Sequence, residues 1–169
     1  TMKKGEFYRS GGEMWSDALH YTMAGLEDIY LLNGFIKKET PYGNGVTLSD
    51  VDGLHKAIGF SLITDRKTLT PKELRFLRKE MRLTQADLAQ RLGLSDQQVA
   101  RWEKGECEIS GPADKLMRIF YAIELLPAQK RMGFLNKLNR SIKALTKSDE
   151  TSSPRLVFKE TQDGWAKAA

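Results

Sequence analysis

The sequence predicts a mainly α-helical protein with a small α+β region near its N-terminal end. Three hydroxyl residues, Thr70, Thr84 and Ser95, each precede a run with apolar residues at helical spacing. Short β-branched and aromatic runs, separated by turn residues, lie before residue 50. We therefore expect helices to dominate from residue 70 onward and strands to lie mostly before it.

The three helix starts carry capping signals. In each, the hydroxyl is followed three positions later by an acidic or amide side chain, which is the arrangement of a capping box or a near relative of it. Proline at the first helical position supports the earliest start. The pairs are Thr70 with Glu73, Thr84 with Asp87, and Ser95 with Gln98.

The segment 84–106, TQADLAQRLGLSDQQVARWEKGE, has the spacing of a DNA-binding helix-turn-helix. Ala89 is small, as needed where a second helix crosses closely, and Gly93 suits a positive φ that ends one helix and directs the next. Apolar residues on both sides of this turn would form one seam shared by two short helices. These residues are Leu88, Leu92, Leu94, Val99 and Trp102.

The same run resembles the Xre/Cro group of bacterial and phage regulators, the lambda-repressor-like domains. Its Thr-Gln opening, Ala89, Gly93, Val99 and the Trp-Glu-Lys-Gly stretch match that family. The resemblance covers about residues 71–126 and implies a lambda-repressor-like helix-turn-helix bundle of four to five helices. It also implies a sequence-specific regulator of transcription that binds double-stranded DNA and is most often a repressor.

The second helix of the motif, residues 95–104, would read the major groove with the face opposite Val99 and Trp102. There Gln97 can pair with adenine and Arg101 with guanine. Asp96 either accepts from a cytosine amino group or simply favours the helix N-terminus. A motif kept only for packing is the alternative. The expected base contacts are Asp96, Gln97, Ala100 and Arg101, and the expected phosphate contacts are Thr84, Gln85, Gln98 and Lys104.

The net charge of +5 is concentrated after the motif, because residues 115–147 carry eight Lys or Arg and one acidic residue. This segment predicts a helix with an apolar stripe and a basic face. It is either a core helix kept soluble by its lysines, or a helix that packs on a second subunit or the N-terminal region with its basic face near phosphates. The stripe is Phe134, Leu135, Leu138, Ile142 and Leu145, and the basic face is Lys137, Arg140, Lys143 and Lys147.

The N-terminal region predicts three short strands and a helix. Asn33-Gly34 would form a hairpin turn between strands at 29–32 and 35–38, and a second turn at 41–45 would lead to a strand at 46–48. A helix would then begin at a cap formed by Ser49 and Asp52. Residues 64–69 are expected to link this helix to the bundle.

Five segments follow from these patterns. Near the end of the chain, the run at 155–158 could add a strand or contact a partner, and the isolated Trp165 is expected to be a loose surface aromatic. The segments are 1–13, a disordered start; 14–69, a small α+β region for dimerisation or partner binding; 70–126, the helix-turn-helix domain; 127–147, the basic amphipathic helix; and 148–169, a flexible tail.

Composition argues against several other classes of protein. Cys107 with only His20 and His55 cannot build a structural zinc site, so no metal or cofactor is expected. His20, His55, Asp50 and Asp52 lie in no nucleophile motif or phosphate loop, so we do not expect an enzyme. No run is long and apolar enough to cross a membrane, and a cytoplasmic location is expected.

Two functions remain open at this stage. The first is a transcriptional regulator that acts as a homodimer on an operator, with the N-terminal region, the 134–145 stripe or both as its interface. The alternative is an antitoxin whose N-terminal region binds a toxin while the bundle represses the shared operon. The layout is similar to MqsA-like antitoxins, but the zinc-binding cysteines of that group are absent.

Overall fold

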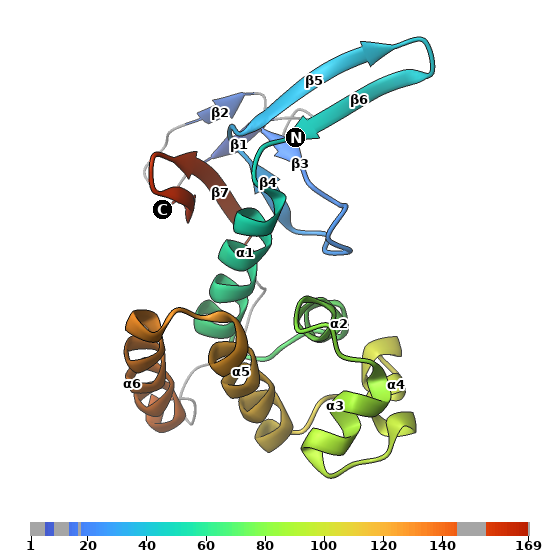
Figure 1. Cartoon of the computed structure of the whole chain (residues 1–169), viewed down its shortest axis with the longest axis vertical. Helices are drawn as coiled ribbons and strands as arrows, with labels where there is room; N and C mark the ends of the chain where they lie inside the picture. Colours follow the sequence, from blue (N-terminus) through green and yellow to red (C-terminus); the bar gives the residue numbers. More distant parts are fainter. Residues whose placement is uncertain (1–5, 9–13, 17, 145–154, 169) are drawn as a thin grey trace. The chain divides into compact units, whose positions relative to one another are not determined.

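The computed structural model describes residues 6–8, 14–16, 18–144 and 155–168, and these form two compact units (Figure 1). The sheet unit contains the described residues up to Ile58 and those from Arg155 onward. The helical unit contains the described residues from Gly59 onward, up to Ala144. Because the division falls inside helix α1, Val51–Asp65, that one helix contributes residues to both units.

The described part of the chain contains six helices together with small sheets, so about half of the protein is helical. No helix among the described residues is long and apolar enough to cross a membrane. After α1, the helices are α2, Pro71–Glu80; α3, Gln85–Leu92; α4, Asp96–Lys104; α5, Gly111–Leu125; and α6, Ala128–Ala144.

The predicted helix starts at Thr70, Thr84 and Ser95 are confirmed. Each is an N-cap with extended backbone, and its side chain accepts a hydrogen bond from the backbone N–H three residues later. Thr70 and Thr84 form complete capping boxes, whereas Gln98, three residues after Ser95, does not return its side chain to the cap. Local hydrogen bonding therefore sets these boundaries, as the spacing predicted.

A buried arginine on α5 closes the C-terminal end of α1. Arg118 donates from Nε to Asp114 Oδ1 at 2.5 Å and from Nη1 to the carbonyls of Ile63 and Arg66 at 3.1 and 2.7 Å. Asp114 also accepts from the backbone N–H of Leu69 at 2.7 Å. These bonds satisfy carbonyls that a helix end leaves unpaired, and they hold the linker between α1 and α2 in place.

The α1 segment in the helical unit approaches α5 closely at Gly59. A Cβ on Gly59 would overlap the Tyr121 ring and hydroxyl, so only glycine fits without a shift. The Tyr121 side chain is fully buried, and its hydroxyl has no hydrogen-bond partner among the described residues. Burial, together with the charge of Glu80, raises the pKa of Tyr121.

The sheet unit is built around a four-stranded sheet in the order β3-β4-β7-β8, in which β4 and β7 are parallel and the other pairs antiparallel. Its strands are β3, Leu19–His20; β4, Ile29–Leu31; β7, Leu156–Thr161; and β8, Gly164–Lys167. Two hairpins complete the strands: β1, Glu6–Tyr8, with β2, Met14–Ser16; and β5, Phe35–Thr40, with β6, Gly43–Leu48.

The prediction of a flexible tail at 148–169 is wrong for residues 156–167. β7 pairs in parallel with β4, and its Leu156 and Phe158 side chains are fully buried. Trp165 is not a loose surface aromatic, because its ring lies where a Cβ on Gly34 would be. The run at 155–158 does add a strand, as one of its two interpretations predicted, but a parallel partner far away in sequence leaves no local signal for the pairing. Residues 148–154 of that predicted tail lie outside the described part.

The predicted Asn33-Gly34 hairpin is also wrong, although strands flank it. Among the described strands, β4 pairs with β3 and β7, whereas β5 pairs with β6 through a turn at Pro41-Tyr42. The Asn33 side chain instead extends the β4–β7 pairing, since it accepts from the Glu160 N–H at 2.6 Å and donates to its carbonyl at 3.2 Å. Gly34 still has a positive φ of 76°, but it redirects the chain to β5 rather than back along β4.

Three smaller predictions need correction. α1 begins at Val51, directly after Asp50, whose carboxylate accepts from the Gly53 N–H at 3.0 Å, whereas the Ser49 hydroxyl donates to the Glu160 carboxylate. α1 also continues to Asp65, which shortens the predicted linker. Within the supposedly disordered start at 1–13, residues 6–8 form β1, and residues 1–5 and 9–13 lie outside the described part.

We expect Gly59→Ala to destabilise the protein by about 1–2 kcal/mol. Overpacking against Tyr121 costs about 1–3 kcal/mol, whereas alanine in place of a mid-helix glycine gains at most about 1 kcal/mol. Gly133→Ala on α6 is the matched control, since a Cβ there meets nothing within 4 Å, and it should stabilise. Urea unfolding of the full chain measures both changes. Equal stabilisation by both variants would contradict the close α1–α5 approach.

Candidate nucleic-acid interface

The helix-turn-helix consists of α3, a turn at Gly93, and α4. Gly93 has a φ of 69° and ends α3, and Gly105 has a φ of 74° and ends α4. The predicted seam is confirmed at Leu88, Ala89, Val99 and Trp102, which are all buried, whereas Leu92 is half-buried and Leu94 is exposed. The seam buries one face of α4 and leaves the other available.

The four predicted base-contact residues lie on α4 away from that seam. Asp96, Gln97 and Arg101 are exposed, with 55% of the Arg101 side chain accessible, and Ala100 is half-buried. The Asp96 carboxylate accepts from the Gln97 N–H at 2.9 Å and so stabilises the first turn of α4. An amide, a guanidinium and a small side chain on one exposed helix face suit hydrogen bonding to base edges.

Glu106 follows α4 and contacts both of its outward cations, a feature that the sequence reasoning missed. Its carboxylate lies 3.6 Å from Arg101 Nε and 4.0 Å from Lys104 Nζ, and half of its side chain is exposed. Exposed pairs of this kind contribute at most about 1 kcal/mol, so a nucleic-acid ligand could displace them. Glu106 therefore orients the two cations without immobilising them.

Three of the four predicted phosphate contacts have side chains engaged within the protein. The Thr84 hydroxyl bonds to the Asp87 carboxylate at 2.6 Å, and the Gln85 amide donates to Glu103 at 2.9 Å. Gln98 donates to the Cys107 sulfur at 3.4 Å. Lys104, with 70% of its side chain exposed, is the most accessible of the set.

A buried ion pair fixes α4 against α2. Arg78 on α2 donates from Nε and Nη2 to the two carboxylate oxygens of Glu103 on α4, at 2.5 and 2.8 Å. Its Nη1 donates to the Leu83 carbonyl at 2.8 Å, in the loop that leads to α3. The Arg78 and Glu103 side chains are only 10% and 4% exposed. One bidentate contact thus positions the helices on both sides of α3.

The carboxylate of Glu103 is held in its charged form. Burial by itself would raise the pKa of Glu103, but hydrogen bonds from Arg78 and Gln85 and the charges of Arg78 and Arg75 outweigh it. The resulting pKa lies below the usual 4.5. Sequence reasoning treated Glu103 as part of a helix-ending turn. Two features of the sequence could have indicated the ion pair. Glu103 directly follows Trp102 of the seam, and Arg78 lies among the apolar residues of α2.

The predicted basic helix is α6, and its features agree in part with each of the two interpretations, a core helix and a helix that packs on a second subunit or the N-terminal region. Phe134 is buried in the helical unit, as a core helix requires, whereas Leu135 is 41% exposed. Lys137 Nζ lies 3.3 Å from Asp65 Oδ1, so this part of the basic face pairs within the unit. The side chains of Ile142 and Lys143, and residues Leu145 and Lys147, lie outside the described part.

The two histidines make contacts inside the sheet unit. The His20 ring stacks on Tyr30 at 4.7 Å and bonds to the Glu27 carbonyl, and His55 bonds to the Tyr21 hydroxyl at 2.8 Å. Among the described residues, no group of three or more His, Cys, Asp or Glu side chains could hold a metal ion. The contacts of the histidines link strands and helix rather than forming a ligand cluster.

We expect Glu103→Gln to destabilise the helical unit by about 3–5 kcal/mol at neutral pH, because it leaves the buried Arg78 guanidinium without its charged partner. Glu106→Gln, which removes an exposed ion pair, is the control and should cost less than about 1 kcal/mol. Urea unfolding followed by circular dichroism compares them. Similar small costs for both would refute the structural role of the Arg78–Glu103 pair.

The same pair should make stability depend on acid pH. Since the pKa of Glu103 is lower in the folded protein than in the unfolded chain, its stabilisation is complete above the unfolded value of 4.5 and is lost as pH falls through the folded value. The stability difference between wild type and Glu103→Gln should therefore shrink between about pH 6 and about pH 3. A difference that does not change over this interval would contradict the lowered pKa.

The family comparison agrees with the geometry of the motif. Residues 74–113, which run from α2 into the start of α5, match the family model described as Helix-turn-helix. Neither the curated proteins nor the solved structures gave a match to the chain. The matched segment is a minority of the 169 residues, so the sheet unit receives no assignment from it. Over residues 74–113 the chain is therefore similar to the Xre/lambda-repressor-like helix-turn-helix domains, a similarity that suggests a DNA-binding regulator of transcription.

Proposed function

We propose that the protein is a sequence-specific transcriptional regulator, acting as a repressor, that inserts α4 into the major groove of double-stranded DNA. The observation that carries the proposal is the two-sided character of α4. Val99 and Trp102 are buried in the seam and Glu103 is locked to Arg78, while Gln97 and Arg101 remain exposed. A helix held rigidly by one face and polar on the other suits base recognition.

Within this proposal the exposed residues have different tasks. Gln97 pairs with adenine, Arg101 forks onto guanine, and Ala100 lets the helix approach a thymine methyl. Lys104 meets a phosphate one turn later. Asp96, which already accepts from the Gln97 N–H, stabilises the helix start and stays close enough to the groove to accept from cytosine.

The phosphate clamp at the start of α3 acts mainly through its backbone. Because the side chains of Thr84 and Gln85 are bonded to Asp87 and Glu103, the N–H groups at this helix N-terminus are the donors best placed to receive a phosphate. The hydrogen bonds from Thr84 lower the pKa of Asp87, so its carboxylate stays charged. A phosphate would therefore bind on the side of the α3 terminus away from Asp87.

The DNA-binding proposal predicts different effects for two substitutions on α4. Arg101→Ala should cost about 1–3 kcal/mol of affinity and relax specificity at one base pair, whereas Lys104→Ala should weaken all sequences alike and lower the salt slope by about one. Fluorescence anisotropy on the region upstream of the gene, at several salt concentrations, measures both.

Lys159→Ala, an exposed lysine on β7, serves as the matched control and should leave the affinity unchanged. Folding of each variant is checked by thermal unfolding, because Arg101 and Lys104 make only exposed contacts with Glu106. If Arg101→Ala binds the upstream DNA as the wild type does, at every salt concentration, α4 is not the recognition helix.

We also propose a homodimer, since one bundle offers little groove contact and two copies would engage half-sites about 34 Å apart. Two surfaces are available. Met132 and Leu135 on α6 are 63% and 41% exposed, and Ile36, on one face of the β5–β6 hairpin, is 61% exposed. Exposed aliphatic groups of this kind are typical of subunit contacts.

The dimer is tested by sedimentation velocity of the full chain. Deleting residues 1–64 is unsuitable, because Arg118 needs the Ile63 carbonyl of α1. Leu135→Glu should give a monomer if α6 is the interface, and Ile36→Glu if the hairpin is. If the wild-type protein stays monomeric at DNA-binding concentrations, with and without the operator, the proposal of a homodimer is wrong.

The antitoxin function remains the second candidate. It is favoured by a separate sheet unit that carries the fully exposed Tyr42 at the tip of the β5–β6 hairpin, with Ile36 and Val46 exposed further along the hairpin on its two faces. A toxin would bind this hairpin while the helical unit represses the operon. Co-expression with a neighbouring toxin-like reading frame distinguishes the two functions. Rescue of growth by the wild type, together with loss of that rescue in Tyr42→Ala, supports the antitoxin. If the wild type does not rescue growth, the repressor is the remaining function.

A further inference from the structure

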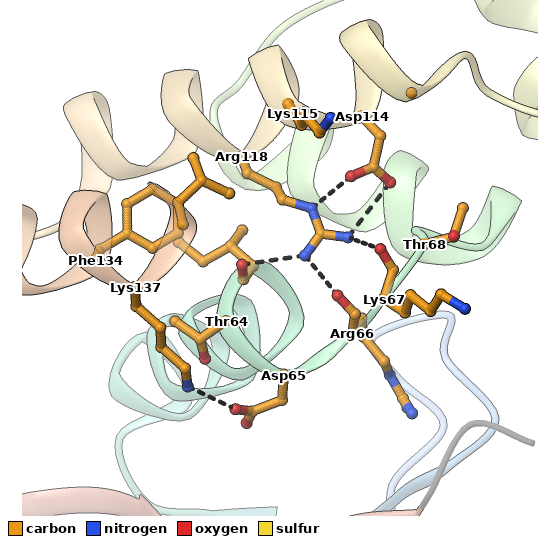
Figure 2. A pocket seen from close by; sticks show the side chains of 13 residues that line it. Thr64, Asp65, Arg66, Lys67, Thr68, Asp114, Lys115, Arg118, Phe134 and Lys137 are labelled. Carbon is orange, nitrogen blue, oxygen red and sulfur yellow. Dashed lines mark hydrogen bonds and ion pairs between the residues drawn. The ribbon is translucent and has the colours of Figure 1, made fainter. Parts of the chain in front are cut away.

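A hollow of about 440 Å³ lies within the helical unit (Figure 2). Its wall is formed by the end of α1 and the linker at 63–68, by the first residues of α5, and by the middle of α6. A volume of this size is that of a pocket for a small molecule. None of the residues predicted to contact DNA lines it.

The hollow combines an apolar part with a cationic one. Ile63 and Phe134 are buried, and both line it. Lys67, Lys115 and Lys137 line it as well, from the linker, α5 and α6. Such a lining complements a ligand that has an apolar body and a negative charge.

The carboxylates in the wall do not cancel this positive charge. Asp114 accepts from Arg118 at 2.5 Å, and Asp65 lies 3.3 Å from Lys137 Nζ, so each has a cationic partner (Figure 2). The lining holds five Lys or Arg side chains against these two carboxylates. The surroundings of the hollow therefore favour an anion over a neutral or cationic molecule.

The wall is preformed. The guanidinium of Arg118 joins Asp114 to the carbonyls of Ile63, Arg66 and Lys67, so α5, α1 and the linker meet at one buried group (Figure 2). A cradle ordered in this way loses little conformational freedom when a ligand enters.

We propose that this hollow binds a small amphipathic anion, a molecule with an aromatic or aliphatic body and one carboxylate, sulfonate or phosphate group. The body lies against Ile63 and Phe134, and the anionic group lies between Lys67 and Lys115. This site belongs to the helical unit and does not depend on DNA binding.

The test uses 8-anilinonaphthalene-1-sulfonate, an aromatic sulfonate whose fluorescence rises in apolar surroundings, with the full chain. We expect saturable binding at one site per chain, with competition by octanoate. Lys67→Gln with Lys115→Gln should weaken binding about tenfold, because a charge-assisted contact is lost. N-phenyl-1-naphthylamine has the same rings without the sulfonate, and its binding should be the same in wild type and this variant.

Two further variants complete the test. Lys79→Gln removes an exposed lysine of α2 outside the hollow and should change nothing, whereas Thr68→Trp places an indole in the wall and should weaken both probes. Circular dichroism and thermal unfolding show that each variant is folded. Absence of saturable binding, or binding that neither Thr68→Trp nor the double variant changes, overturns the proposal. If the double variant weakens the binding of both probes equally, the two lysines do not recognise the anionic group, and that part of the proposal is overturned.

Discussion

The buried pair between Arg78 and Glu103 determines how the exposed face of α4 is presented. It joins α2 to α4 directly and reaches the loop before α3 through the Leu83 carbonyl. An ion pair this deeply buried contributes little net stability compared with an apolar contact, but losing one partner is costly. Its value is geometric, since a bidentate contact between two planar groups permits one relative orientation of the two helices.

Arg118 fixes the position of α1 and the linker against α5, just as Arg78 fixes α2 against α4 in the motif. Both are buried arginines that pair with a carboxylate and also cap backbone carbonyls, at the α1 end in one case and before α3 in the other. The first orients α4, for which we propose a role in DNA binding, and the second shapes the hollow for which we propose a ligand. A ligand that changed the contacts of Arg118 would act on the linker that leads into α2.

Local chemistry made the helix-turn-helix predictable. Caps at Thr70, Thr84 and Ser95, the positive φ of Gly93 and the apolar seam each depend on residues no more than about one helical turn apart, so their spacing carries the information. The exposed face of α4 followed from the seam by helical geometry. The bonds that engage Gln85 and Gln98 could not be foreseen, because their partners Glu103 and Cys107 are brought near by the turn.

The sequence by itself determined the helix starts after Thr70, Thr84 and Ser95 and the helix-turn-helix motif that two of them frame. The tertiary structure alone decided which strands pair and which charges are buried. β7 closes against β4 from the far end of the chain, and Asn33 turns its side chain to that pairing instead of forming a hairpin. Capping and periodicity are local, whereas parallel pairing and buried ion pairs join residues that no short pattern connects.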